Sequence, residues 1–413
     1  MDLLIMFAKP KPIPLLLAAV ISLGFTAVGC SSNSKQTQAT SSPGSAQNAA
    51  NTGNGSQSPS ASPLPEKASA SEYDQIGINS AKNGDLTTAE QAWRKSIELE
   101  PKNADFRTKL GAVLQGQNKL DEASTQYQEA IRVKPDFAPA HQSLGILLVN
   151  QGKKEEAVAS LTKARDLFKK EGKTEDQVKT QTQLAVLEAE QGKMDSAIAD
   201  LKEVTKLKPD FLPGYYVLAE ILASQGKPDE AIATLKKAKD VFKKQGNNEQ
   251  LAEIQTNLAL VLGKQKKVDE AIREVKEAIN LKPDYAPAYY TLARALNTQG
   301  KPDEAITNLS KAKDLFKQQG KTPQLIEVQF NLAVLLAQQK KLDESIAEAK
   351  ELTTIKPDFA PAYAILGQAL LQQGKKDEAK ENLTKARDLF KEKNQTQAVT
   401  EVEKVLAQLE QKK

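Results

Sequence analysis

The sequence predicts an all-α fold, a superhelical solenoid of stacked helix hairpins. A seven-residue motif, Lys-Pro-Asp-Phe-Ala-Pro-Ala at 134–140, returns with few changes at 208–214, 282–288 and 356–362, always 74 residues apart. A second marker, a turn of the Gln-Gly-Lys type, recurs at alternating intervals of 34 and 40 residues. It begins at Gln117, Gln151, Gln191, Gln225, Gln265, Gln299, Gln339 and Gln373. A fixed period in this range indicates a repeat architecture in which each unit packs on its neighbours.

The composition agrees with many amphipathic helices packed side by side. Charged residues make up 27% of the chain and aromatic residues 5%, and no runs alternate as strands do. The net charge of +4 is too balanced to predict a nucleic-acid partner. Cys30 and His141 are the single cysteine and histidine, so one chain cannot assemble a disulfide framework or a Cys/His metal cluster. We therefore expect no metal, no cofactor and no small-molecule substrate.

Residues 1–29 are predicted to be a signal peptide, because Lys9 and Lys11 precede an apolar run too short to span a membrane comfortably. The following Ala27-Val28-Gly29-Cys30 resembles the lipobox of bacterial lipoproteins, although that family prefers Leu where Ala27 stands. The resemblance implies a lipid anchor on Cys30, palmitate included, and Ser31 after it implies the outer membrane, facing the periplasm. The alternative is an ordinary secretory signal cleaved after Gly29, and either Met1 or Met6 could be the start.

Residues 30–69 are predicted to form a disordered tether behind the lipidated cysteine. The stretch is rich in Ser, Gln, Asn, Thr, Pro and Gly and almost lacks large apolar side chains, so it cannot bury enough surface to offset its ordering entropy. A coil of this length would reach roughly 30–40 Å. We expect it to hold a folded body clear of the bilayer.

Residues 70–399 divide into nine predicted helix hairpins of 34 or 40 residues, alternating from residue 104 on, with a capping helix over 400–413. The units run 70–103, 104–137, 138–177, 178–211, 212–251, 252–285, 286–325, 326–359 and 360–399. In the 40-residue units we expect a second helix prolonged by about a turn or more. A left-handed cap should end it, at Gly172, Gly246, Gly320 and Asn394.

The second unit, residues 104–137, shows most clearly the pattern of residues that the units share. Its members are Leu110, Gly111, Leu114, Ala123, Tyr127, Ala130 and Pro135. This pattern resembles the tetratricopeptide repeat. A small residue on each first helix allows two helices to approach closely. It stands at Gly77, Gly111, Gly145, Ala185, Ala219, Ala259, Ala293, Ala333 and Gly367. The resemblance implies a concave face, built from the first helices, that binds peptides.

Two features that could suggest catalysis have structural explanations. His141 lies one period before Tyr215, Tyr289 and Tyr363, so it is predicted to occupy an aromatic packing position. Acidic pairs such as Asp229-Glu230 recur at the first turn of the second helices, where they complement the helix dipole. The sequence therefore predicts no catalytic residues.

The family's groove positions, carried onto this chain, predict a peptide-binding groove. They are Thr182, Tyr216, Glu220, Tyr290, Arg294, Asn297, Phe330 and Gln368. Mixed aromatic and polar lining suits an extended segment or a helix. The equal alternative is that these aromatics only pack between neighbouring repeats.

The sequence as a whole predicts a non-catalytic scaffold, lipid-anchored in the bacterial envelope, that binds other proteins in envelope or outer-membrane complexes. The alternatives are a glycan- or peptidoglycan-binding protein, an envelope enzyme, and self-association through the ends of the array. An enzyme would need a nucleophile, base or metal site, and the sequence offers none beyond carboxylates.

Overall fold

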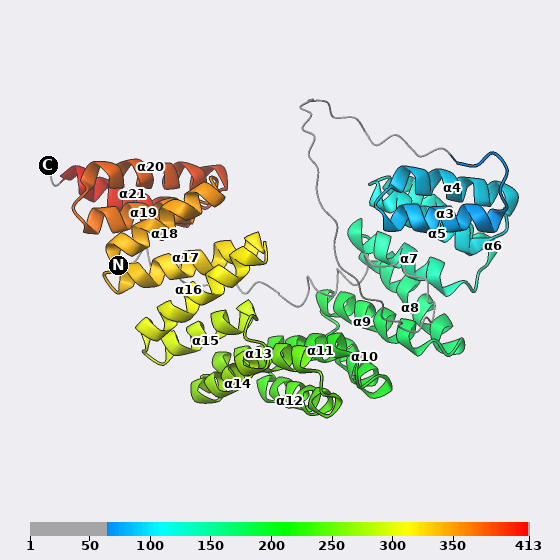
Figure 1. The fold of residues 1–413 in the computed structure, drawn as a ribbon, viewed down its shortest axis with the longest axis horizontal. Helices are drawn as coiled ribbons and strands as arrows, with labels where there is room; N and C mark the ends of the chain where they lie inside the picture. The colour runs from blue at the N-terminus through cyan, green and yellow to red at the C-terminus, as the bar shows by residue number, and fades with distance from the viewer. Residues whose placement is uncertain (1–63, 412–413) are drawn as a thin grey trace, which may run out of the picture. The chain divides into compact units, whose positions relative to one another are not determined.

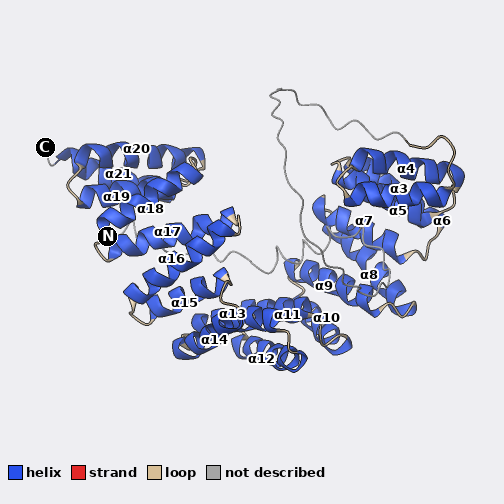
Figure 2. Ribbon diagram, in the orientation of Figure 1, coloured by secondary structure: helices blue, strands red, loops and turns tan. Residues whose placement is uncertain are grey.

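The computed structural model describes residues 64–411, and all regular structure in this range is helical (Figure 2). Nineteen helices, α3 to α21, follow one another within it, which confirms the all-α prediction (Figure 1). The predicted signal peptide, Cys30 and most of the tether lie outside the described residues. The chain forms two compact units, here called the N-terminal unit (residues 64–217) and the C-terminal unit (residues 218–411). Helix α11 (Leu212–Ser224) crosses the boundary.

Each unit is a succession of helix hairpins. The N-terminal unit contains α3 (Ala70–Lys82), α4 (Leu86–Leu99), α5 (Ala104–Gly116), α6 (Leu120–Val133), α7 (Ala138–Asn150), α8 (Lys154–Lys170), α9 (Thr174–Glu190) and α10 (Met194–Leu207). The C-terminal unit contains α12 (Pro228–Gln245), α13 (Asn248–Lys264), α14 (Val268–Leu281), α15 (Ala286–Thr298), α16 (Pro302–Gln318), α17 (Thr322–Gln338), α18 (Leu342–Ile355), α19 (Ala360–Gln372), α20 (Lys376–Glu392) and α21 (Thr396–Gln411). None of these helices is long and apolar enough to cross a membrane.

Proline and left-handed residues set the ends of the helices. Lys134 ends α6 with an extended backbone, φ −137° and ψ 88°, because the following Pro135 disfavours the helical conformation before it. Turns within hairpins use a residue with positive φ, usually glycine, as at Gly152 (φ 73°). Lys266 (φ 59°) and Lys340 (φ 60°) adopt the same conformation with a side chain, so the tight turn is kept even where glycine is replaced.

The extra residues of the 40-residue units lengthen two helices rather than one. The left-handed caps are confirmed, with φ of 68° at Gly172, 69° at Gly246, 64° at Gly320 and 54° at Asn394. Helix α8 has 17 residues against 14 in α6, as expected. The first helix that follows is also longer, however, because α9 has 17 residues against 13 in α5 and starts at Thr174. The insertion is thus divided between the two helices that flank the left-handed cap, α8 and α9.

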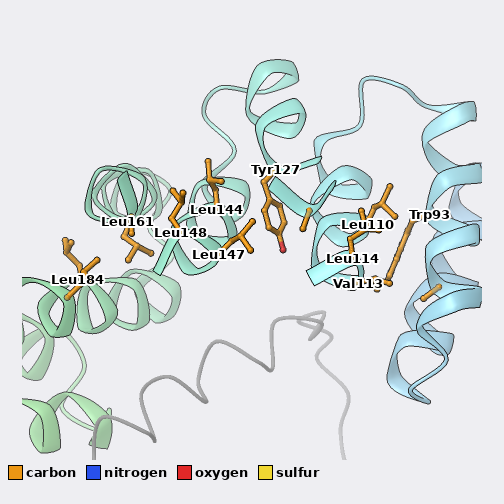
Figure 3. Packing of buried hydrophobic residues seen from close by; sticks show 14 of the residues in the cluster. Trp93, Leu110, Val113, Leu114, Tyr127, Leu144, Leu147, Leu148, Leu161 and Leu184 are labelled. Carbon is orange, nitrogen blue, oxygen red and sulfur yellow. The ribbon is translucent and has the colours of Figure 1, made fainter. Parts of the chain in front are cut away.

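One apolar cluster of the N-terminal unit runs through residues of α3 to α9 (Figure 3). Trp93 and Tyr127 are its largest members and are 0% and 1% exposed. Each ring lies against a glycine of the preceding helix: a Cβ added to Gly77 would lie 2.6 Å from Trp93 Cε2, and one added to Gly111 would lie 2.5 Å from Tyr127 Cε1. The predicted close approach of the two helices is therefore confirmed at these hairpins.

Ion pairs link successive second helices at intervals of one period. Lys239 Nζ on α12 lies 2.7 Å from Glu274 Oε2 on α14, and Lys313 Nζ on α16 lies 2.6 Å from Glu348 Oε1 on α18. These four side chains are 16–20% exposed. These carboxylates and ammonium groups are therefore already paired with one another within the chain.

At the C-terminal end, α21 lies against α19 and α20. Val402 and Leu406 of α21 share one apolar cluster with Leu383 and Phe390 of α20. Repeat arrays need a terminal element of this kind because the last hairpin would otherwise expose its apolar face.

Candidate functional site

A groove of about 310 Å³ opens on the first helices of the C-terminal unit. Helices α13, α15 and α17 supply most of its lining, with Val268 from α14 and Leu309 from α16. The side chains on the lining are Ala259, Leu260, Gly263, Lys264, Val268, Tyr290, Thr291, Ala293, Arg294, Ala295, Asn297, Thr298, Leu309, Asn331, Val334, Leu335 and Gln338. These first helices present one stripe to their own second helices and the opposite stripe to the groove, because helical neighbours recur every three to four residues.

The lining combines an apolar floor with a polar rim. Val334 and Leu335 of α17 are buried and Leu260 of α13 is half-buried. Arg294 and Asn297 are exposed at the rim, one turn apart on α15. A groove of this make-up can hold apolar side chains on its floor while hydrogen-bonding polar groups at its edge.

Tyr290 forms one wall of the groove and is held by two polar groups of α17. Its hydroxyl donates to Glu327 Oε1 at 2.8 Å and accepts from Asn331 Nδ2 at 2.8 Å. The amide of Asn331 also donates to the Glu327 carbonyl oxygen at 2.9 Å. Burial, followed by the negative charge of Glu327, raises the pKa of the Tyr290 phenol above its ordinary value. The phenol is therefore protonated at neutral pH and keeps its ring in place.

Arg294 lies over this ring, with its guanidinium carbon 5.8 Å from the ring centroid. No carboxylate within residues 64–411 forms an ion pair with it. A guanidinium stacked on an aromatic ring keeps its N–H edges directed away from the ring, so they can donate to a ligand.

A second cation stands on the neighbouring first helix. Lys264, exposed on the last turn of α13, lines the groove and acts electrostatically on Glu220 of α11. Burial raises the pKa of the Glu220 carboxyl, and the Lys264 charge opposes that rise. Lys264 is therefore partly balanced by Glu220, whereas Arg294 has no such partner among the described residues.

The structure brings three of the eight predicted groove residues into this lining: Tyr290, Arg294 and Asn297. Thr182 does not line an open surface, because it is 1% exposed and its hydroxyl donates to the Val178 carbonyl oxygen at 2.7 Å. Gln368 is 8% exposed and likewise buried. Both side chains are covered by their neighbours, so neither can meet a partner in this conformation.

The remaining three predicted residues lie elsewhere. Phe330 packs edge-on against Phe359 with ring centroids 5.5 Å apart, and it does not belong to the lining. Tyr216 and Glu220 are half-buried on α11 and do not belong to the lining. Their positions in the repeat are the same as those of Tyr290 and Arg294, one period earlier.

The sequence reasoning missed Lys264, Asn331 and Gln338. Lys264 and Gln338 stand at equivalent places one period apart, at the C-terminal ends of the long first helices. The signal that could have found them is their helical spacing: Lys264 lies four residues after Leu260 and Gln338 four residues after Val334, one turn along the face that lines the groove.

His141 and the acidic pair Asp229-Glu230 have the structural roles that the sequence predicts. His141 Nε2 lies 2.9 Å from the Pro135 carbonyl oxygen, and the hydroxyl of Tyr289 donates to the Pro283 carbonyl oxygen at 3.0 Å, so the two side chains fill equivalent roles. Asp229 and Glu230 lie in the first turn of α12, after Pro228. Within residues 64–411, no group of three His, Cys, Asp or Glu side chains is placed to hold a metal ion.

Family models of the tetratricopeptide repeat match most of the helical region. Two models described as "Tetratricopeptide repeat" match residues 213–284 and 284–358, and residues 138–170, 178–211 and 360–393. A third, described as "TPR repeat", matches residues 116–152. Together the three models cover more than half of the chain.

Three curated proteins show a partial similarity. Protein O-mannosyl-transferase TMTC3 of Homo sapiens and of Mus musculus are each 28% identical over 151 residues, which is 34% of this chain and 16% of theirs. Anaphase-promoting complex subunit 7 of Dictyostelium discoideum is 28% identical over 141 residues, or 34% of this chain and 23% of that protein. The chain thus spans less than a quarter of the length of these relatives.

Two solved structures are similar at low sequence identity. A tetratricopeptide repeat protein from Parabacteroides merdae is 16% identical, with a TM-score of 0.45 over 65% of this chain and 98% of that one. Pseudomonas aeruginosa pilF is 19% identical, with a TM-score of 0.42 over 53% of this chain and 94% of that one. The repeat period, the helix hairpins, the close-packed small residues and the family models agree, and the chain belongs to the tetratricopeptide repeat family.

Proposed function

We propose that this chain is a non-catalytic scaffold that binds a segment of another protein in the groove of α13, α15 and α17. Tetratricopeptide repeats generally bind other proteins. The observation that carries the proposal is the groove itself, in which an apolar floor meets an exposed rim with Arg294 and Asn297. The name of TMTC3 describes a transferase, but the match covers only 16% of that protein and gives no support for transferase activity in this chain.

Magnitudes set a lower limit on the length of the bound segment. Burying one large apolar side chain contributes about 1.5–3 kcal/mol, and a hydrogen bond to a charged group contributes about 1.5–3 kcal/mol. Micromolar affinity requires about 8 kcal/mol after the costs of association are met. One apolar and one charged contact fall short of this, so the bound segment must also contact surfaces beyond the groove.

Filling the groove should abolish binding without removing any packing. Asn297 is exposed on the rim, so Asn297→Trp places an indole over the opening and leaves the core intact. We expect the partners recovered by in-cell crosslinking and mass spectrometry to fall at least tenfold. The matched control is Asn280→Trp on α14, an equally exposed asparagine outside the groove, which should leave recovery unchanged. Equal recovery from both variants would argue against this groove.

We further propose that the chain is lipid-anchored through Cys30 in the bacterial envelope, in the outer membrane facing the periplasm, where it supports the assembly of envelope complexes. The support is the sequence Ala27-Val28-Gly29-Cys30 followed by Ser31. Two acyl signals are enough for stable attachment, whereas one chain binds only reversibly.

Cys30→Ser should remove the anchor. We expect cells fed an alkyne-labelled palmitate to label the wild-type chain, and the variant to lose both the label and its sedimentation with membranes. Ser31→Ala is the control and should keep both. Membrane density fractionation of the wild type then separates outer from inner membrane. An unlabelled wild-type chain in the cytosol would contradict the proposed location.

A further inference from the structure

We propose that the groove of α13, α15 and α17 selects a partner segment in which an acidic side chain, Asp or Glu, stands next to an apolar one, with Arg294 as the residue that receives the carboxylate. This inference rests on the proposed function and specifies the class of segment bound. The occupant is a polypeptide of another protein, and its apolar side chain occupies the floor.

The charge of the lining supports the proposal. Lys264 and Arg294 are its only charged residues, and no Asp or Glu lines the groove. On the second helices of the same unit, cations such as Lys239 and Lys313 are paired with carboxylates of the next second helix. Arg294 has no ion pair within residues 64–411 and rests on the Tyr290 ring instead. A carboxylate of a partner protein could therefore form the ion pair that Arg294 lacks among the described residues.

The surroundings of Arg294 fix the direction of its N–H edges. The Tyr290 ring on which it stacks is held by Glu327 and Asn331, so the platform is rigid before a ligand arrives. Asn297, one turn further on, makes no side-chain hydrogen bond within the described range and adds an amide donor to the same rim. A planar guanidinium next to an amide donor suits a carboxylate, which accepts two parallel hydrogen bonds.

The other repeats do not share this charge. One period earlier, Glu190 and Glu220 stand at the positions of Lys264 and Arg294, and one period later Gln338 and Gln368 stand there. Glu190 is already paired with Lys154, whose Nζ lies 2.8 Å from its Oε2. The pair of cations therefore belongs to one place in the array and is not a property of the repeat. The position of the acidic residue in a partner segment would therefore determine which residues of that segment lie against the groove.

The test is a selection of random dodecapeptides displayed on phage against the purified full chain. Four forms are compared: wild type, Arg294→Glu, the groove-filling Asn297→Trp and, as matched control, Arg273→Glu. Arg273 is exposed on α14, outside the groove, and has no ion pair within residues 64–411. Peptides recovered by the wild type are then synthesised, and their affinities are measured by fluorescence anisotropy with Glu or Asp, Gln, and Lys at the enriched position.

We expect the wild type and Arg273→Glu to enrich Asp or Glu beside an apolar residue, and Arg294→Glu to enrich Lys or Arg at that place. Replacing the acidic residue of the peptide by Gln should weaken binding to the wild type about 10- to 100-fold, the value of one hydrogen bond to a charged group. Thermal unfolding of Arg294→Glu should match that of the wild type, because the side chain is exposed.

Two other results would overturn the inference, and they are distinguishable. Peptides that bind the wild type, are lost in Asn297→Trp and show no excess of acidic residues would remove the charge preference and leave the proposed function standing. No enriched peptide at all, together with co-sedimentation of the wild type but not of Asn297→Trp with purified cell-wall sacculi, would assign the groove to an acidic glycan and remove both.

Discussion

Replacing Tyr127 by alanine is expected to lower the free energy of unfolding of its hairpin by about 3–5 kcal/mol, the usual cost of removing a buried aromatic ring. Tyr127 lies in the apolar cluster of the N-terminal unit (Figure 3) and is 1% exposed. Its ring lies against Gly111 of the preceding helix. The two helices already approach closely at Gly111, so they have little room to move together and fill the cavity that the ring would leave. In a repeat array each unit packs only on its neighbours, so the loss should appear first in α5 and α6 and then in adjoining hairpins.

Urea unfolding followed by far-ultraviolet circular dichroism measures this effect. Trp93 is the only tryptophan and is fully buried next to α5, so its fluorescence reports the same region separately. Tyr127→Phe is the matched control. It keeps the ring and removes the hydroxyl, whose hydrogen bond to Gln115 Oε1 at 3.1 Å contributes about 0.5–1.5 kcal/mol. If the alanine variant lost no more than the phenylalanine variant, the ring would not belong to the core.

Gly77→Ala and Gly263→Ala should change stability in opposite directions. A Cβ at Gly77 would lie 2.6 Å from Trp93 Cε2, and the indole is itself fully buried. We expect a loss of about 1–3 kcal/mol from overpacking, with a red shift of Trp93 emission. Gly263 lies within α13, and apart from its chain neighbours and the nearby backbone of its own helix nothing lies within 4 Å of the added carbon. There the better helix propensity of alanine should add about 1 kcal/mol.

Gly77→Ala and Gly263→Ala serve as controls for each other, because both variants add the same methyl group to a helix. Thermal unfolding monitored by circular dichroism gives the sign of each change. A stabilising Gly77→Ala would show that α3 and α4 do not approach as closely as the structure places them.

The fold was predictable because its determinants are local and repeat nine times. Lys-Pro-Asp turns end the second helices through the backbone restriction before proline, and left-handed residues close the remaining turns. The length of α9 was not predictable in the same way. The difference between 34 and 40 residues gives the number of residues inserted in a long unit. It does not determine how these residues are divided between the helices on either side of Gly172.

The groove was predictable only in part. Tyr290, Arg294 and Asn297 follow from positions along a single helix. The burial of Thr182 and the contact between Phe330 and Phe359 depend on which side chains of other helices cover them. Residues 29 positions apart in sequence meet in the second case, and helical periodicity carries no information about such contacts. Arg294's unpaired state likewise depends on the identity of every neighbour.

Photo-crosslinking in living cells shows directly whether the groove binds a segment of another protein. A benzophenone amino acid is placed at Thr298, on the groove lining, or at Lys276, exposed on α14. We expect the probe at Thr298 to capture a defined protein segment and the probe at Lys276 to capture none. Capture that is equal from the two positions, or absent from Thr298 while other surfaces retain partners, would contradict this expectation.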